Sequence, residues 1–279
     1  MTTNLDSPLL TESEVSDAID LLGMPVHPVD FEQAVAILLN LARGKNTTYA
    51  VTANVDHMVR FSRDHEIRPL YEQADLVVAD GMPLIWASKM LGTRLPERVA
   101  GSDLFPRLCQ EAAKHDLSVF LLGGAPGTAD EAARVLTERH AGLRVAGTYC
   151  PDYGFENDAA ECRRIVESIR QSNPDIVFVG LGSPKQERWI VANREACGAG
   201  LCIGVGISFS FVCGDVVRAP RWMQRAGLEW LHRLRQEPRR LAMRYLWDDV
   251  GFFWLVAKAL GARTWKRVFA AGNLHGPDE

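Results

Sequence analysis

The feature that most limits the possible folds is a series of short apolar runs, each ending in glycine or a small polar residue. The clearest is Leu76–Ala79, an uninterrupted apolar run followed by Asp80 and Gly81. Strands that are buried on both faces of a parallel sheet have this composition. Similar runs lie at 48–53, 118–122, 175–180 and 201–204, with helical patterns between them. The alternation predicts an α/β core, a mainly parallel Rossmann-like sheet with helices on both faces.

The Asp80-Gly81 pair occupies the position where such a sheet binds ligands. In open α/β sheets, the carboxyl ends of the strands line the ligand crevice, and Gly81 lets the backbone turn sharply there. Asp80 is therefore a candidate catalytic carboxylate and Gly81 a candidate substrate contact. The alternative is that Asp80 only caps the helix that starts at Met82.

Two further polar groups lie at the carboxyl end of the run at 48–53. Thr52 and Asn54 would emerge beside Asp80 if the two strands are neighbours, although ordinary helix capping explains them equally well. Arg98 follows in a loop, where its planar fork of donors suits a phosphate. It could equally be a surface arginine paired with Glu97.

Two turns between a strand and a helix are candidate anion sites. Gly123 and Gly124 open a glycine-rich turn before the sequence Thr128-Ala-Asp-Glu131, which predicts a capping box. The spacing is neither that of a P-loop nor that of a dinucleotide-binding motif, and a tight turn is the alternative. Lys185 and Gln186 open a later helix and carry donors for a diphosphate or a sugar hydroxyl, although Lys185 alone would be an ordinary surface residue.

Charge is distributed unevenly along the chain. The net charge of -4 argues against a nucleic-acid binder. The segment from Arg218 onward nevertheless carries about +6 and the rest about -10, so the C-terminal end should face an anionic partner. Its apolar stretch at 249–262 is too short to span a bilayer and is flanked by Arg263, Trp265 and Lys266. We expect it to lie in a membrane interface, with packing on the core or on a second subunit as the alternative.

These patterns divide the chain into a disordered leader at 1–20, an α/β core at 21–217 and a cationic, amphipathic helical appendage at 218–279. The first residues lack a basic start and an apolar stretch, so no secretory signal is expected. The six cysteines form no CxxC pair, which favours reduced thiols over disulfides or a zinc site. We therefore expect a cytoplasmic protein attached peripherally to the inner face of the cell membrane. A homo-oligomer is also compatible with the sequence.

Seven motifs in order resemble the WecG/TagA/CpsF family of bacterial glycosyltransferases, over roughly residues 22–247. They are TANVDHMV from Thr52, ADLVVADGMPLIWA from Ala74, LPERVAGSDL from Leu95, FLLGGAPG from Phe120, VGLGSPKQERW from Val179, GVGISFSFVCGDVVRAPRW from Gly204 and GLEWLHRLRQEPRRLAMRY from Gly227. The resemblance implies a GT-E-like fold. It also implies that a sugar is transferred with inversion from a UDP-sugar donor, usually of the N-acetylmannosamine type, to a polyprenyl-diphosphate-linked sugar in cell-surface polysaccharide synthesis. No metal or other cofactor is implied.

The resemblance also assigns roles to single positions. Asp80 matches the general base that takes the proton from the acceptor hydroxyl. Thr52 and Asn54 match residues near the donor sugar and the base, Arg98 an arginine of the active-site loop, and Gln186 a donor-contacting residue. The tail residues Arg233, Arg240 and Arg244 match arginines that can neutralise the diphosphates.

One position departs from the family pattern. Ser210 stands between Phe209 and Phe211 where the family usually has aspartate, which removes a carboxylate from a site expected to touch the donor. UDP-glucose, as in exopolysaccharide synthesis, is therefore an alternative donor. A protein of another class, a non-catalytic nucleotide-sugar-binding subunit of a polysaccharide assembly complex, is a further alternative.

Overall fold

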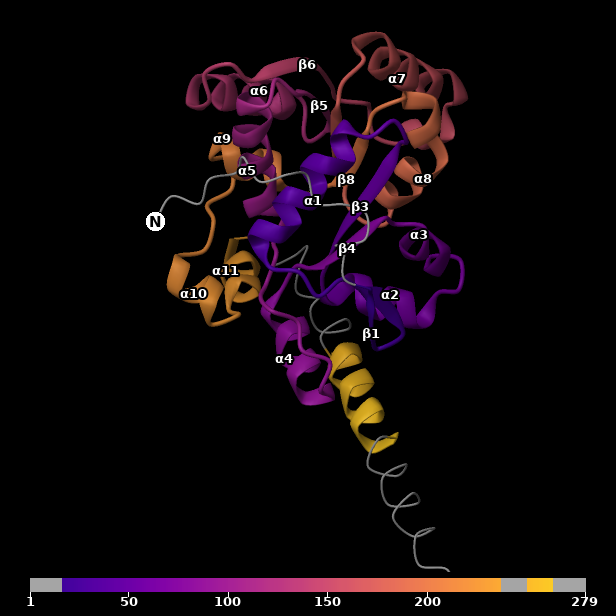
Figure 1. The fold of residues 1–279 in the computed structure, drawn as a ribbon, viewed down its shortest axis with the longest axis vertical. Helices are drawn as coiled ribbons and strands as arrows, with labels where there is room; N and C mark the ends of the chain where they lie inside the picture. Colours follow the sequence, from indigo (N-terminus) through magenta and orange to yellow (C-terminus); the bar gives the residue numbers. More distant parts are fainter. Residues whose placement is uncertain (1–16, 237–249, 263–279) are drawn as a thin grey trace, which may run out of the picture.

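The computed structural model describes residues 17–236 and 250–262 (Figure 1). Its strands are β1 (Ile19–Leu21), β2 (Met24–Val26), β3 (Thr48–Ala53), β4 (Leu76–Ala79), β5 (Ser118–Gly123), β6 (Arg144–Tyr149), β7 (Ile176–Gly180) and β8 (Leu201–Gly204). Its longer helices are α1 (Phe31–Arg43), α2 (Val55–Arg63), α4 (Met82–Leu91), α5 (Gly101–Lys114), α6 (Thr128–Arg139), α7 (Ala159–Ser172) and α8 (Lys185–Cys197). The shorter ones are α3 (Arg68–Glu72), α9 (Ser208–Cys213), α10 (Arg221–Arg225), α11 (Glu229–Gln236) and the 3₁₀ turn η2 (Phe155–Asn157). Residues 250–262 form one more helix.

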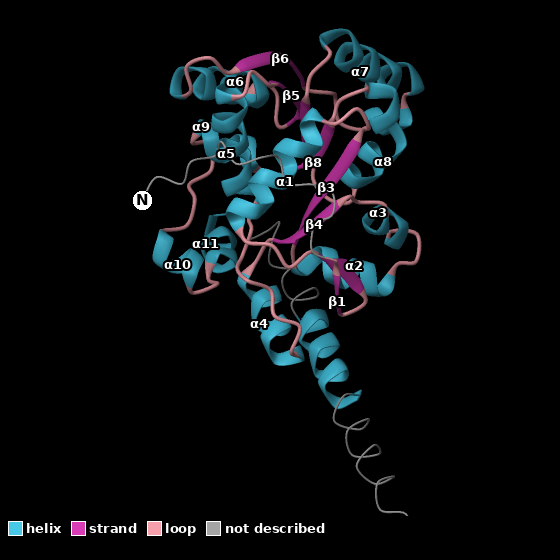
Figure 2. Ribbon diagram, viewed as in Figure 1, coloured by secondary structure: helices cyan, strands magenta, loops and turns pink. Residues whose placement is uncertain are grey.

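Six strands form one parallel sheet in the order β4-β3-β8-β7-β5-β6 (Figure 2), and β1 and β2 form a separate antiparallel pair. The predicted α/β class is therefore confirmed. β3 and β4 are neighbours, with Thr52 opposite Val78 and Ala53 opposite Ala79. Residues that follow these two strands consequently emerge side by side.

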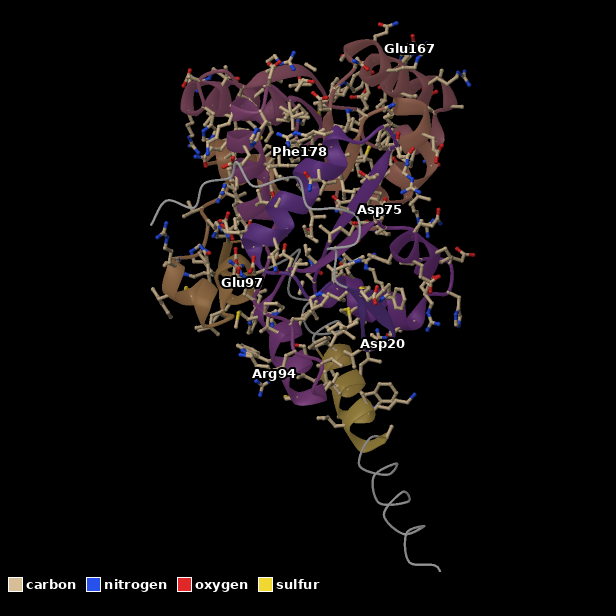
Figure 3. All side chains as sticks on the ribbon, viewed as in Figure 1. Asp20, Asp75, Arg94, Glu97, Glu167 and Phe178 are labelled. Atoms are coloured by element: carbon tan, nitrogen blue, oxygen red, sulfur yellow. The ribbon has the colours of Figure 1, made fainter. Side chains whose placement is uncertain are left out.

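The two faces of the sheet bury separate apolar layers. On β3, Tyr49, Val51 and Ala53 belong to one layer, whereas Ala50 belongs to the other, as the alternation of side chains along a strand requires. The first layer is closed by α2, α3, α7 and α8, the second by α1, α5, α6 and α9. Figure 3 shows Phe178 of β7 inside the molecule and Glu167 of α7 at its periphery.

Helix starts follow the predictions at some positions and not at others. Asp30 caps α1, because its carboxylate accepts from the Gln33 N–H at 2.8 Å. The capping box predicted at Thr128 is wrong: Gly127, in the left-handed conformation, is the cap residue and Thr128 is the first residue of α6. α5 begins at Gly101, after the cap residue Ala100, and no side chain caps it.

The helix at 250–262 packs one side against the core. Phe252 and Val256 are buried in the same layer as Val59 of α2. Gly251 lies at this contact, close to the Arg63 guanidinium and to Val59. The alternative that this helix packs on the core therefore holds for its side with Phe252 and Val256, while Phe253 and Trp254 are exposed. Among the described residues, no helix has both the length and the hydropathy to cross a bilayer.

Candidate active site

A cavity of about 350 Å³ opens at the carboxyl ends of β3, β4 and β8. The helix that follows β3 covers one face of the sheet and the helix that follows β8 covers the other. Neighbouring parallel strands whose connections leave in opposite directions create a crevice between them, and ligands of open α/β sheets bind there. The topology therefore places the cavity where a substrate site is expected.

Asp80 borders this cavity at the end of β4. Its N–H donates to the Ala53 carbonyl at 2.6 Å, which ties it to β3. Its Oδ2 accepts from the Gly101 N–H at 3.0 Å, at the first turn of α5. The capping alternative is wrong for α4, since Gly81 is the cap residue there and no side chain caps the helix.

Gly101 is necessary for this arrangement. A Cβ at Gly101 would lie 2.9 Å from Thr52 Oγ1, so a larger residue would push the start of α5 away from β3. The position of α5 matters because its positive N-terminal end faces the Asp80 carboxylate.

The pKa of the Asp80 carboxyl is raised from 3.8 to about 6, chiefly by burial. The charge of Arg98 and the hydrogen bond from Gly101 lower this pKa, and the charges of Glu229 and Asp103 raise it. A carboxyl with a pKa near 6 is ionised at neutral pH and is a stronger base than an ordinary aspartate. Asp80 can therefore accept a proton in the cavity.

Arg98 lies in an ion-pair network at the cavity wall. It pairs with Glu229 of α11 at 3.0 Å and with Asp103 of α5 at 3.1 Å. Arg218 forms a bidentate pair with the same Asp103, with distances of 2.5 and 2.7 Å. The alternative pairing with Glu97 is wrong, because the Glu97 carboxylate accepts from the Phe31 N–H instead. Arg98 thus links α11 to the loop that follows α4.

Thr52 and Asn54 line the cavity beside Asp80. Asn54 caps α2, which confirms the helix-capping alternative for this residue. Its Oδ1 accepts from the His57 N–H at 3.3 Å. Thr52 is not a cap, and its hydroxyl donates to the Gly204 carbonyl at 3.5 Å. Convergence of these two residues on Asp80 follows from the pairing of β3 with β4.

Gln186 reaches the cavity from the first turn of α8 and is 4% exposed. Its Oε1 accepts from the Gly206 N–H at 3.2 Å, and its Nε2 donates to Glu187 at 2.8 Å. His57 of α2 also lines the cavity, with Nε2 3.8 Å from the Glu187 carboxylate. Asp56, which also lines the cavity, and His57 are both buried.

Comparison with known proteins identifies the class. The model of the glycosyl transferase family WecG/TagA/CpsF matches residues 19–266. The chain belongs to this family. An N-acetylglucosaminyldiphosphoundecaprenol N-acetyl-beta-D-mannosaminyltransferase of Bacillus spizizenii strain W23 is 31% identical over 224 residues, which cover 77% of this chain and 84% of that protein. A protein of the same name from Staphylococcus aureus strain MW2 is 28% identical over 226 residues, which cover 80% and 86%.

Four expected substrate contacts of this glycosyltransferase lie outside the cavity lining. Lys185 pairs with Glu156 at 2.6 Å and lies over the Tyr153 ring. Gly124, after Gly123 at the end of β5, donates its N–H to the Gly180 carbonyl at 2.9 Å. Ser210 lies in α9, where its carbonyl accepts from the Val216 N–H. Ser210 is therefore not part of the cavity lining.

The structure describes only one of the three expected arginines of the tail. Arg233 belongs to α11, whereas Arg240 and Arg244 lie outside the described residues. Gly81, the remaining expected contact, lines the cavity.

Aromatic side chains from three helices also line the glycosyltransferase cavity. They are Trp86 of α4, Trp230 of α11, and Phe252 and Phe253 of the 250–262 helix. Trp86, Trp230 and Phe253 are also exposed, as is Trp254, the residue after Phe253. We call Trp86, Trp230 and Phe253 the aromatic rim. The apolar stretch at 249–262 was a signal for part of it, whereas nothing in the sequence joined α4 to it.

Proposed function

We propose that this glycosyltransferase moves a sugar of the N-acetylmannosamine type from its UDP-linked donor to a sugar carried on polyprenyl diphosphate, with inversion and with Asp80 as the general base. The observation that carries the proposal is the Asp80 carboxylate, held at the cavity by Gly101 and with a pKa of about 6. The family supplies the reaction class, and the names of the relatives supply the acceptor.

The reaction needs one base and one stabilised leaving group. Ionised Asp80 takes the proton of the acceptor hydroxyl while that oxygen bonds to the anomeric carbon of the donor. The bond from this carbon to the diphosphate breaks on the opposite face, and its electron pair leaves with UDP. Arg98 would stabilise the charge that develops on the diphosphate, together with Arg233, Arg240 and Arg244 of the tail.

The ion pairs of Arg98 are compatible with this role. Glu229 and Asp103 hold the guanidinium at the cavity wall, and both Arg98 and Glu229 line the cavity. A donor diphosphate, like a carboxylate, offers two oxygens that can accept both parallel N–H groups of a guanidinium, so it can take over one of these contacts.

The aromatic rim supports a lipid-linked acceptor. Tryptophan and phenylalanine side chains around a cavity mouth favour the boundary between water and acyl chains. We propose that the rim and the cationic tail attach the enzyme to the anionic inner face of the cell membrane, so that the polyprenyl diphosphate reaches the cavity from the bilayer.

The test is a transfer assay with a short-chain polyprenyl-diphosphate-linked N-acetylglucosamine as acceptor. UDP-N-acetylmannosamine, its uronic acid and UDP-glucose are offered separately, with and without EDTA, and the lipid product is identified by mass spectrometry. We expect a disaccharide lipid from a mannosamine-type donor, unaffected by EDTA. Product from UDP-glucose alone would overturn the donor assignment. Tight UDP binding without any product would favour a non-catalytic binding subunit.

A further inference from the structure

Glu187, in the first turn of α8, is a buried carboxylate directly behind a cavity residue. Its side chain is 1% exposed, yet it follows Gln186, which lines the cavity. Its Oε1 accepts from Gln186 Nε2 at 2.8 Å, and its Oε2 has no hydrogen-bond partner among the described residues. Burying a carboxylate is costly unless polar groups compensate it. Gln186 lies within hydrogen-bond distance of Glu187, and His57 Nε2 lies 3.8 Å from it.

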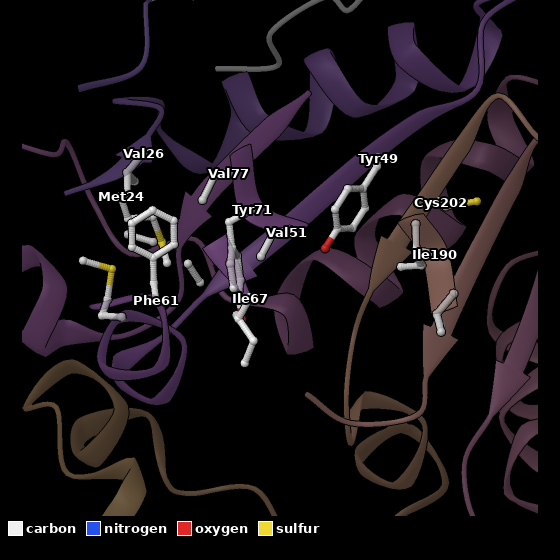
Figure 4. Close-up of a cluster of buried hydrophobic side chains, with 14 of the residues drawn as sticks. Met24, Val26, Tyr49, Val51, Phe61, Ile67, Tyr71, Val77, Ile190 and Cys202 are labelled. Carbon is white, nitrogen blue, oxygen red and sulfur yellow. The ribbon is translucent and has the colours of Figure 1, made fainter. Parts of the chain in front are cut away.

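The surroundings of Glu187 are polar groups within an apolar layer. The hydroxyls of Tyr49 and Tyr71 are buried there, and that of Tyr49 has no hydrogen-bond partner among the described residues; Figure 4 shows both rings in this layer. The pKa of each phenol is raised, first by burial and then by the charge of Glu187, so both lie near the carboxylate.

The orientation of the Gln186 amide is fixed from two sides. The Gly206 N–H can only donate, so the group that faces it must be the amide oxygen, at 3.2 Å. The Glu187 carboxylate accepts, so the group that faces it must be the amide nitrogen. Only one amide N–H of Gln186 then remains for a ligand.

The end of β8 leaves space for the Gln186 amide. A Cβ at Gly204 would lie 2.6 Å from Gln186 Nε2, so glycine leaves the room in which the amide meets Glu187. Gly204 has an ordinary strand conformation and ends β8, so this space and not backbone freedom accounts for the glycine.

We infer that Glu187 is a positioning residue: it holds the Gln186 amide so that its remaining N–H donates to an oxygen of the nucleotide-sugar donor in the cavity. This rests on the proposed function, because the ligand is the donor of that reaction. Glu187 acts through Gln186 and does not itself touch the substrate.

The test is a double-mutant cycle on donor affinity, measured by calorimetric titration of the full chain with UDP-N-acetylmannosamine and with UDP. Glu187→Leu removes the acceptor for Nε2 and should weaken donor binding about tenfold. Glu187→Gln keeps an oxygen that can accept from Nε2 and should stay within about threefold of the wild type. In the Gln186→Ala background, Glu187→Leu should change affinity less than about twofold.

A second variant keeps the test independent of whether Glu187→Leu folds. Gly204→Ala leaves the carboxylate in place but crowds the Gln186 amide, so it should also raise the dissociation constant about tenfold. The same substitution should be nearly silent in the Gln186→Ala background. In steady-state assays, both changes should raise the donor KM and leave kcat within about threefold, since the proton transfer is not affected.

Additive effects in both backgrounds would overturn the positioning role, because they would mean that Glu187 and Gly204 act without Gln186. Failure of the wild type to bind either nucleotide would instead overturn the proposed function. The two failures are therefore distinguished by the wild-type titration alone.

Discussion

The Asp80 carboxylate accepts a hydrogen bond from the Gly101 N–H, with 3.0 Å between Oδ2 and N. This bond joins the end of β4 to the start of α5 and fixes the carboxylate at the cavity. The hydrogen bond from Gly101 lowers the pKa of Asp80, but burial raises it further, to about 6. Asp80 therefore combines a fixed position with the basicity that proton abstraction needs.

The rate of transfer should depend on the ionisation of Asp80. Its pKa of about 6 predicts that kcat/KM is constant from pH 7 to 8 and falls about tenfold per pH unit below pH 6. The direction follows because a base works only in its deprotonated form. A pH profile that stays flat down to pH 4.5 would show that another group takes the proton.

Two charge variants should shift the pH at which kcat/KM falls, which we call the acid limb of the profile, in opposite directions. Arg98 lowers the pKa of Asp80, so Arg98→Gln should shift the limb upward by about one pH unit. Glu229 raises that pKa, so Glu229→Gln should shift the limb downward by about half a unit. Arg98→Lys keeps the charge and serves as the control, with its limb near that of the wild type. Shifts of the same sign in the two glutamine variants would refute the electrostatic assignment.

Asp80 should reduce the stability of the folded protein at neutral pH. Each pKa unit corresponds to about 1.4 kcal/mol, so a rise from 3.8 to about 6 costs the folded state at most about 3 kcal/mol when Asp80 is ionised. Water at the cavity reduces this cost. The cost is absent below about pH 3, where both states are protonated, grows as the pH rises from about 4 to 6, and is near its full value above about pH 7.

Asp80→Asn, which puts a neutral side chain of the same shape at this position, should remove this stability cost. Asp80→Asn should raise the melting temperature at pH 8 by about 3 to 6 °C and change it little at pH 4. Asp103→Asn is the matched comparison and should lower the melting temperature at pH 8, because Asp103 is paired with Arg98 and Arg218. An Asp80→Asn protein no more stable than the wild type at pH 8 would be inconsistent with a raised pKa.

The aromatic rim should contribute to membrane attachment. Replacing Trp86 and Phe253 by serine should weaken partition onto anionic vesicles about tenfold or more, since both lose exposed apolar area. Trp222 is as exposed as Phe253 and belongs to α10, which lies to the side of α4 and the 250–262 helix in Figure 1, so Trp222→Ser is the control. Equal losses for the rim and control variants in a vesicle flotation assay would contradict a role specific to the rim.

Much of the fold could be predicted because its determinants are local. Apolar runs such as Leu76–Ala79 identify buried strands without reference to the rest of the chain. Once β3 and β4 are neighbours, Thr52, Asn54 and Asp80 must meet, and the structure shows that they do.

The remaining features depend on contacts between distant segments. Arg98 pairs with Glu229, which lies 131 residues further along the chain, and no local pattern relates the two. Asp56 and His57 are polar residues near the start of α2, yet both are buried, and His57 lies 3.8 Å from Glu187 of α8. Lys185 has the right chemistry for a diphosphate, yet Glu156 holds it outside the cavity lining.

The general-base role of Asp80 is tested most directly by the single-turnover rate of sugar transfer in Asp80→Asn, measured beside the affinity for UDP. The asparagine oxygen can still accept from the Gly101 N–H, so UDP should bind within about threefold of the wild type. Loss of the base should lower transfer by at least about 100-fold. Transfer within tenfold of the wild-type rate, with UDP binding intact, would contradict the assignment of Asp80 as the base.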